Sequence, residues 1–132
     1  KVRLLVRGVC CVRPGVKGLS ENIEVVSIID RFLEHSRVYY FSNGGKPLMY
    51  LASFDMMTRN LDLRVEVAAP VIDPRIQREI MDHLEIQFRD NVKARVYDEQ
   101  GRSVYRSVPG PRIRSQMELY DYVKKQAKKR RA

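Results

Sequence analysis

Two basic side chains and a nearby set of polar side chains form the part of this sequence best suited to chemistry. His35 and Arg37 stand two residues apart in the segment EHSRVYYF, and alternation along an extended chain places both on one face. The segment SFDMMTRN supplies hydroxyl, carboxylate, guanidinium and amide groups from Ser53, Asp55, Arg59 and Asn60. Arginine binds phosphate oxygens in a bidentate manner, and histidine moves a proton or acts as a nucleophile. The combination predicts a site for a phosphoryl group.

The residues around this set predict a β-hairpin followed by a third strand. A tight turn is expected at the sequence SNGG, because asparagine and glycine tolerate the left-handed backbone that such turns need. The expected elements are strands at 37–41 and 48–53, a loop or single turn at 54–60, and a strand at 63–71 that carries Glu66. The hairpin would bring His35 and Arg37, at the mouth of its first strand, close to the end of the second.

The flanking sequence predicts further strands and helices in alternation. Periodicity predicts strands at 1–12, 93–97 and 103–107. Capping residues predict a helix from an N-cap at Ser20 to about His35, and a second helix that Asp73 and Pro74 open and that runs to about Asp90. A last helix is expected from Ser115 to Gln126, with a frayed basic tail at 128–131. Such a mixture indicates an α/β or α+β domain, with a mixed sheet flanked by helices.

Arg7 stands out because the strand predicted around it is otherwise apolar. A buried charge without a partner costs several kcal/mol, on the order expected for desolvation. We therefore expect Arg7 to face either an anion or a carboxylate, and Glu66 could serve as the carboxylate.

Other residues that could do chemistry have simpler interpretations. His83 lies in mid-helix between Asp82 and Glu85 and is expected to be solvated. The adjacent Cys10 and Cys11 offer no metal-binding spacing and indicate reduced thiols. Asp55 and Arg59 are four residues apart, so a local ion pair and contact with a ligand both remain open.

Charge is distributed unevenly along the chain. Of the 132 residues, 1–101 hold fifteen Lys or Arg against fourteen Asp or Glu, whereas 102–132 hold ten against two. A basic end points to a polyanion or a partner chain. A basic module that binds polyanions or nucleic acid is therefore one alternative, although the near-neutral balance of residues 1–101 counts against nucleic acid.

The arrangement around His35 resembles one half of a phospholipase D-type active site, which has the pattern H-x-K. Arg37 takes the place of the lysine, and Ser42 stands where the usual aspartate falls. A phospholipase D-like phosphodiesterase with one half-site, completed by dimerisation, is a second alternative. The two departures count against it.

Longer motifs resemble the C-terminal region of bacterial polyphosphate kinases. They are VRGVCCVRPGVKGLSENIEVVSIIDRFLEHSRVYYFSNGG, SFDMMTRNLDLRVEV, PVIDPRIQREIMD and NVKARVYD. The resemblance implies that residues 1–132 form a C-terminal phospholipase D-like catalytic domain, a fragment whose upstream domains are absent.

The resemblance also implies a function. Family members transfer the ATP γ-phosphate reversibly onto polyphosphate through a phosphohistidine that lies upstream, so this chain would supply the second half of the active site. His35 matches the family's second essential histidine, expected to donate a proton to the leaving group, and Arg7 matches an arginine that contacts nucleotide phosphate. The residues expected to bind ATP or polyphosphate phosphates are Arg7, His35, Arg37, Arg59, Asn60, Arg64 and Glu66.

Cofactors and partners follow from the same resemblance. Mg²⁺ is expected with ATP, with ligands mainly outside this chain, so no metal-binding residue is assigned. The expected partners are ATP and ADP, inorganic polyphosphate, the upstream domains and further copies in a homo-oligomer, but not nucleic acid. The protein is expected in the cytoplasm, with a capacity to associate with the inner membrane. The isolated chain is expected to fold without making polyphosphate.

Overall fold

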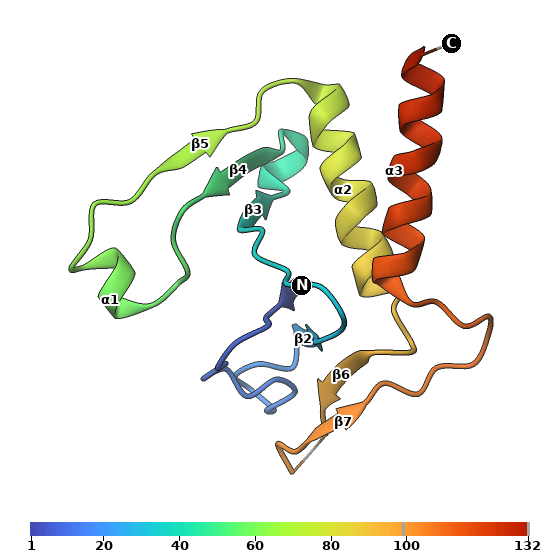
Figure 1. Cartoon of the computed structure of the whole chain (residues 1–132). Helices are drawn as coiled ribbons and strands as arrows, with labels where there is room; N and C mark the ends of the chain where they lie inside the picture. Colours follow the sequence, from blue (N-terminus) through green and yellow to red (C-terminus); the bar gives the residue numbers. More distant parts are fainter. Residues whose placement is uncertain (99, 132) are drawn as a thin grey trace. The chain divides into compact units, whose positions relative to one another are not determined.

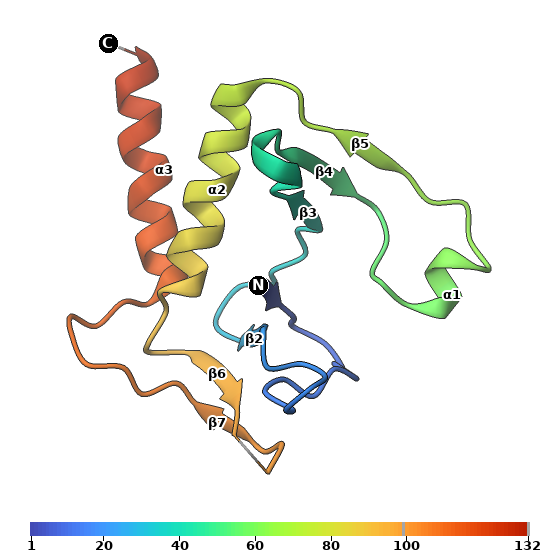
Figure 2. The ribbon, with the colours of Figure 1, turned by 180° about the vertical axis from the view of Figure 1, so that it is seen from behind.

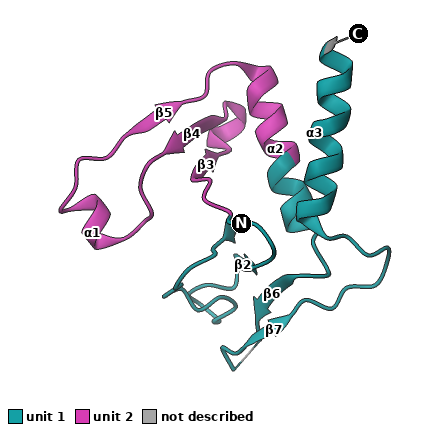
Figure 3. Ribbon diagram, in the orientation of Figure 1, with its two compact units in different colours: residues 1–33, 83–132 teal, residues 34–82 magenta. Residues whose placement is uncertain are grey.

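The computed structural model describes residues 1–98 and 100–131, with side chains up to residue 130. The chain forms two compact units, one made of residues 1–33 and 83–132 and the other of residues 34–82 (Figures 1 and 3). The mixed strands and helices confirm the α+β class.

The first unit contains a four-stranded sheet in the order β1-β2-β6-β7. Its strands are β1 (Val2–Leu5), β2 (Ile23–Ile28), β6 (Ala94–Tyr97) and β7 (Ser103–Tyr105). β1 and β2 are parallel, whereas β2 and β6, and β6 and β7, are antiparallel. The sheet is therefore mixed, as expected, and the predicted strand pair at 93–97 and 103–107 is confirmed.

The helix predicted from Ser20 is wrong, because this segment forms β2. Four of the six residues of β2 are β-branched, which favours a strand. Pairing on both sides then buries Val25, Val26 and Ile28. The hydroxyl of buried Ser20 accepts a hydrogen bond from the Val16 N–H and donates one to a backbone carbonyl, so it closes a loop and caps no helix.

The first unit is completed by α3 (Ser115–Arg131) and the last residues of α2 (Pro74–Phe88). These parts of α2 and α3 lie side by side in both views (Figures 1 and 2). Phe88 packs with three residues of the sheet, Val26, Ile28 and Ala94, in the apolar core. The predicted frayed tail is wrong, because α3 continues to Arg131, where basic side chains favour a helix C-terminus.

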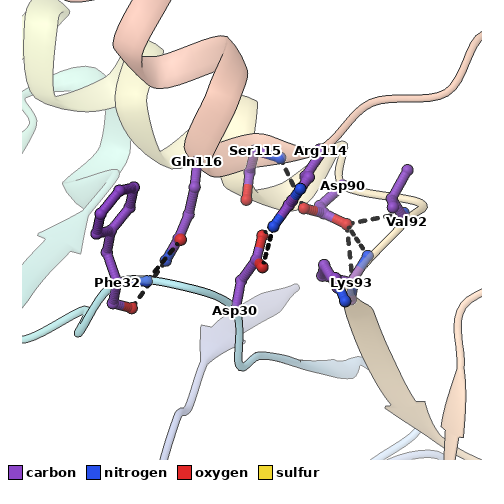
Figure 4. Close-up of polar contacts among 9 residues, drawn as sticks. Asp30, Phe32, Asp90, Val92, Lys93, Arg114, Ser115 and Gln116 are labelled. Carbon is purple, nitrogen blue, oxygen red and sulfur yellow. Dashed lines mark hydrogen bonds and ion pairs between the residues drawn. The ribbon is translucent and has the colours of Figure 1, made fainter.

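Buried polar contacts join the start of α3 to the rest of the first unit (Figure 4). The carboxylate of Asp90, which is fully buried, accepts hydrogen bonds from the backbone N–H groups of Val92, Lys93, Ala94 and Ser115. Beside it, the Arg114 guanidinium donates two hydrogen bonds, of 2.6 and 2.7 Å, to the two oxygens of Asp30.

The second unit contains the predicted hairpin and a three-stranded sheet in the order β3-β4-β5. Its elements are β3 (Val38–Phe41), the 3₁₀ turn η1 (Asn43–Gly45), β4 (Leu48–Ala52), the single-turn helix α1 (Thr58–Leu61) and β5 (Ala68–Pro70). Asn43, Gly44 and Gly45 all have positive φ, which explains the turn. Within residues 34–82, all of which are described, Met49 is the only buried apolar side chain.

Two predicted strands are shorter than expected. β1 ends at Leu5 rather than near residue 12, and β5 begins at Ala68 rather than at residue 63. β4, the partner of β5, ends at Ala52, so the residues before Ala68 lack a neighbouring strand. Beyond that point one backbone hydrogen bond remains, from the Ser53 N–H to the Val67 carbonyl. The strand before Ala68 was therefore predicted too long because no neighbouring strand continues beside it, whereas β2 continues to Ile28 past the end of β1.

His83 is not solvated as predicted. Its ring packs edge-on against Tyr122 of α3, with 5.2 Å between the ring centroids, and its Nε2 atom is buried without a hydrogen bond to a described residue. In the described part of the chain, no helix combines the length and the apolar character that a membrane span requires.

Candidate active site

His35 and Arg37 meet as their spacing predicted. Both precede β3, and the Nη2 atom of Arg37 lies 3.1 Å from the Nε2 atom of His35. His35 is exposed, whereas the Arg37 side chain is 19% exposed. The pair thus combines an exposed imidazole with a guanidinium that is mostly buried and contacts it.

Asp55 holds Arg37 from the opposite side of the hairpin. Arg37 donates through Nε to Oδ1 at 2.9 Å and through Nη2 to Oδ2 at 3.4 Å, a bidentate contact. The hydrogen bond from Arg37 holds the pKa of Asp55 below its ordinary value, and the positive charge of Arg59 acts in the same direction. Asp55 therefore pairs with Arg37 rather than forming the local pair with Arg59 that the sequence left open.

The segment that carries Asp55 is fixed at both ends. Before it, the Phe54 ring stacks on Tyr39 of β3 with 5.2 Å between centroids, and the Tyr39 hydroxyl donates to the Phe54 carbonyl at 3.0 Å. After it, Asn60 is buried and donates through Nδ2 to the Asp55 carbonyl at 3.4 Å. The carboxylate is thus presented to Arg37 by an anchored turn.

Ser53 and Glu66 form a second polar contact in this unit. The Ser53 hydroxyl donates to the Glu66 carboxylate and accepts a hydrogen bond from the Val67 N–H at 3.0 Å. Within residues 34–82, Ser53 is thus the side-chain partner of Glu66. Glu66 lies on the segment that leads into β5.

The remaining predicted site residues are exposed cations. Arg59 lies in α1, and Arg64 lies in the irregular segment that follows it. Arg7 belongs to the other compact unit, two residues beyond the end of β1. The expectation of a buried Arg7 is wrong, because the strand ends before it, and among the described residues it forms no ion pair.

The chain matches a known family over most of its length. Residues 1–117 fit the family model described as "Polyphosphate kinase C-terminal domain 2". The chain belongs to the polyphosphate kinase family.

Individual family members agree with this assignment. A polyphosphate kinase from Klebsiella pneumoniae is 52% identical over 126 residues, covering 93% of this chain and 18% of that protein. A polyphosphate kinase from Escherichia coli K12 is 50% identical over 126 residues, which also cover 93% of this chain and 18% of that protein. The crystal structure of polyphosphate kinase from Porphyromonas gingivalis matches with a TM-score of 0.92 and 42% identity, over 98% of this chain and 20% of that chain. The chain thus spans about a fifth of the length of these polyphosphate kinases.

The structural match also confirms the expected phospholipase D-like fold with a mixed sheet.

Magnesium finds no fitting ligand set in the part of the chain that the structure describes. Among the described residues, no group of three or more His, Cys, Asp or Glu side chains is placed to hold a metal ion. Two acids of this unit are already engaged, Asp55 by Arg37 and Glu66 by Ser53. No step that uses magnesium is therefore assigned to these residues.

Sequence reasoning named Asp55 in the polar set but did not find its partner. A signal for it was present in the hairpin register, because the Ala52 N–H donates to the Arg37 carbonyl. This register places the residues just after Ala52 beside those just before Val38, and Asp55 is the first acidic residue among them.

Proposed function

We propose that this chain forms part of the active site of an enzyme that transfers the ATP γ-phosphate reversibly onto polyphosphate, with His35 as its catalytic residue. The contact of His35 with Arg37, in a member of the polyphosphate kinase family, carries the proposal. Phosphoryl transfer asks little covalent chemistry of a protein, because the rate comes mainly from positioning and from neutralising developing charge. An accessible imidazole backed by a guanidinium suits that task.

Each predicted residue has a role consistent with its surroundings. His35 would donate to the oxygen on which charge develops as ADP leaves. The exposed guanidinium groups of Arg7, Arg59 and Arg64 would contact phosphate oxygens of ATP or polyphosphate. Arg37 would add charge beside His35, whereas Asn60 and Glu66 would shape the loop through their contacts.

The proposal extends to the rest of the enzyme. Residues 1–132 would be its C-terminal catalytic domain, and the phosphorylated histidine and the magnesium ligands would lie in other domains of the same polypeptide. The enzyme would be a cytoplasmic homo-oligomer able to associate with the inner membrane. The isolated chain would then bind phosphates without making polyphosphate.

The test compares His35→Gln with His83→Gln in the full-length protein, since these are the chain's two histidines. Polyphosphate synthesis from ATP and magnesium is measured together with a thermal melt. Removing a group that acts in the transition state typically costs about 10²–10⁴-fold in kcat. We expect a loss of that order for His35→Gln and near-normal synthesis for His83→Gln.

Full synthesis by a folded His35→Gln enzyme would remove His35 from the catalytic machinery. Hydrolysis of a phosphodiester by a dimer of this chain without ATP would favour the phospholipase D-like alternative. Strong, salt-sensitive binding of nucleic acid that ignores the His35 change would favour the basic-module alternative.

A further inference from the structure

Asp55, Arg37 and His35 form a continuous line of contacts within residues 34–82. The carboxylate holds Arg37 Nε at 2.9 Å and Nη2 at 3.4 Å, and the same Nη2 lies 3.1 Å from His35 Nε2. The line is anchored at its acidic end by Tyr39, Phe54 and Asn60, as described above. The orientation of the Arg37 guanidinium is therefore set by Asp55.

This geometry determines which nitrogen of His35 carries the proton. A guanidinium has only N–H donors and no acceptor, so its contact with Nε2 requires the ring nitrogen to accept. In a neutral imidazole the other nitrogen is then the donor, so the contact favours the Nδ1–H tautomer. An imidazolium would instead place an N–H group against the N–H group of Arg37.

We propose that Asp55 is a positioning residue that, through Arg37, selects for the neutral imidazole of His35 the tautomer whose Nδ1–H is directed to the transferring phosphoryl group. The choice of acceptor rests on the proposed function, whereas the tautomer rests on the contacts alone. Asp55 does not need to touch substrate in this role. The Asp55 contact disfavours the Nε2–H tautomer of His35, in which Nδ1 carries a lone pair and cannot donate a hydrogen bond.

The reaction step can be written with its bonds balanced. The bond between the γ-phosphorus of ATP and the β,γ-bridging oxygen breaks, and phosphorus bonds to the attacking nucleophile. The electron pair stays on the oxygen that leaves with ADP, and the Nδ1–H of His35 hydrogen-bonds to that oxygen without giving up its proton. A neutral histidine acting as a fixed hydrogen-bond donor is an established catalytic pattern. His35 then serves as a hydrogen-bond donor, in place of the proton donor expected from the sequence resemblance.

The tautomer is read directly by ¹⁵N NMR of histidine-labelled protein. The chain has two histidines, so His83→Gln assigns the His35 signals. At a pH where His35 is neutral, we expect the Nδ1–H form to dominate in the wild type and a mixture of tautomers in Asp55→Asn. Asp55→Glu retains the carboxylate and should keep the Nδ1–H form. A dominant Nε2–H form in the wild type, or an unchanged ratio in Asp55→Asn, would overturn the proposal.

Asp73→Asn is a matched control, because Asp73 also receives a guanidinium, that of Arg75, at 2.8 Å, but has no contact with His35. It should leave the His35 tautomer unchanged, and a tautomer shift in this variant would refute the assignment of the effect to the Asp55 contact.

Kinetics of the full-length protein provide the second readout. A displaced catalytic group costs on the order of 10²-fold, so Asp55→Asn should lower kcat by roughly ten- to a hundredfold with little change in the KM for ATP. A shifted tautomer with unchanged kcat would refute the positioning role. Wild-type protein without polyphosphate synthesis would refute the proposed function and leave the tautomer result standing.

Discussion

Asp90 is the residue whose replacement should most reduce the stability of the first unit. Its Oδ1 accepts hydrogen bonds from the backbone N–H groups of Val92, Lys93 and Ala94 at 2.9, 2.6 and 2.9 Å. Its Oδ2 accepts one from Ser115, the first residue of α3, at 2.7 Å. One carboxylate thus joins the turn before β6 to the start of a helix 25 residues away.

Asp90→Asn keeps the shape of the side chain and removes one acceptor. The single amide oxygen can accept hydrogen bonds either from the three N–H groups before β6 or from that of Ser115, so at least one buried donor loses its partner. Losing a hydrogen bond to a charged group costs about 1.5–3 kcal/mol, and the remaining bonds become weaker neutral ones. Recovery of the desolvation cost of the charge offsets part of this loss. We expect a decrease of about 3 kcal/mol in the free energy of unfolding and, for a domain of this size, roughly 10 °C in Tm.

The pH dependence gives the same prediction a second test. Burial raises the pKa of Asp90, but the hydrogen bonds from Ser115, Lys93 and Ala94 outweigh it and hold the pKa below its ordinary value. A lowered folded-state pKa contributes stability that is present above the unfolded pKa, about 3.9, and is lost as the pH falls through the folded value. The stability difference between wild type and Asp90→Asn should therefore shrink as the pH is lowered below about 4.

The assay is urea unfolding followed by tyrosine fluorescence and far-UV circular dichroism, since the chain has seven tyrosines and no tryptophan. Asp73→Asn is the control, because Asp73 is more exposed and its guanidinium partner, Arg75, is in water. It should cost less than about 1 kcal/mol. A loss below about 1 kcal/mol for Asp90→Asn, at an unchanged urea dependence, would refute the role assigned to its hydrogen bonds.

Two further substitutions test the two units separately by the same denaturation assay. Arg114→Gln leaves the Asp30 carboxylate, only 3% exposed, without its cation and should cost about 2 kcal/mol, less than a fully buried pair because Arg114 is 39% exposed. A loss near zero would show that water satisfies Asp30. Met49→Ala truncates the one buried apolar side chain of residues 34–82 and should cost about 3 kcal/mol. An unchanged midpoint would mean that this unit does not depend on that contact.

Local patterns predicted the elements that hold the candidate site. The turn residues Asn43, Gly44 and Gly45 have the positive φ values that their types favour, and the register of the hairpin follows from that turn. The start of α2 was similarly predictable, since Pro74 at its first position follows Asp73, whose carboxylate accepts the Arg75 N–H at 2.8 Å. In each case the deciding interactions lie within a few residues along the chain.

The failures have a common cause in contacts between distant segments. β2 has apolar residues at helical spacing, but pairing with β1 and β6 decides its conformation. Arg7 falls outside β1, which ends at Leu5 opposite Val26 although β2 continues to Ile28. Asp55 and Arg59 fit the i,i+4 rule only if both lie on one helix, and α1 begins at Thr58, after Asp55. The partner of Asp55 is Arg37, 18 residues away, which the i,i+4 spacing does not reach and only the hairpin register indicates.

Asp55 and Asp90 show why a shifted pKa does not by itself locate an active site. Both carboxyls have lowered pKa values, but Asp90 is held by backbone N–H groups, whereas Asp55 is held by a side chain that also contacts an exposed histidine. The first arrangement fixes the fold and the second orients a reactive group. Asp55 is half-exposed and Asn keeps one acceptor for Arg37, so Asp55→Asn should change stability by only about 0–1 kcal/mol while altering His35. Asp90→Asn should do the reverse, because its contacts with backbone amides do not extend to His35.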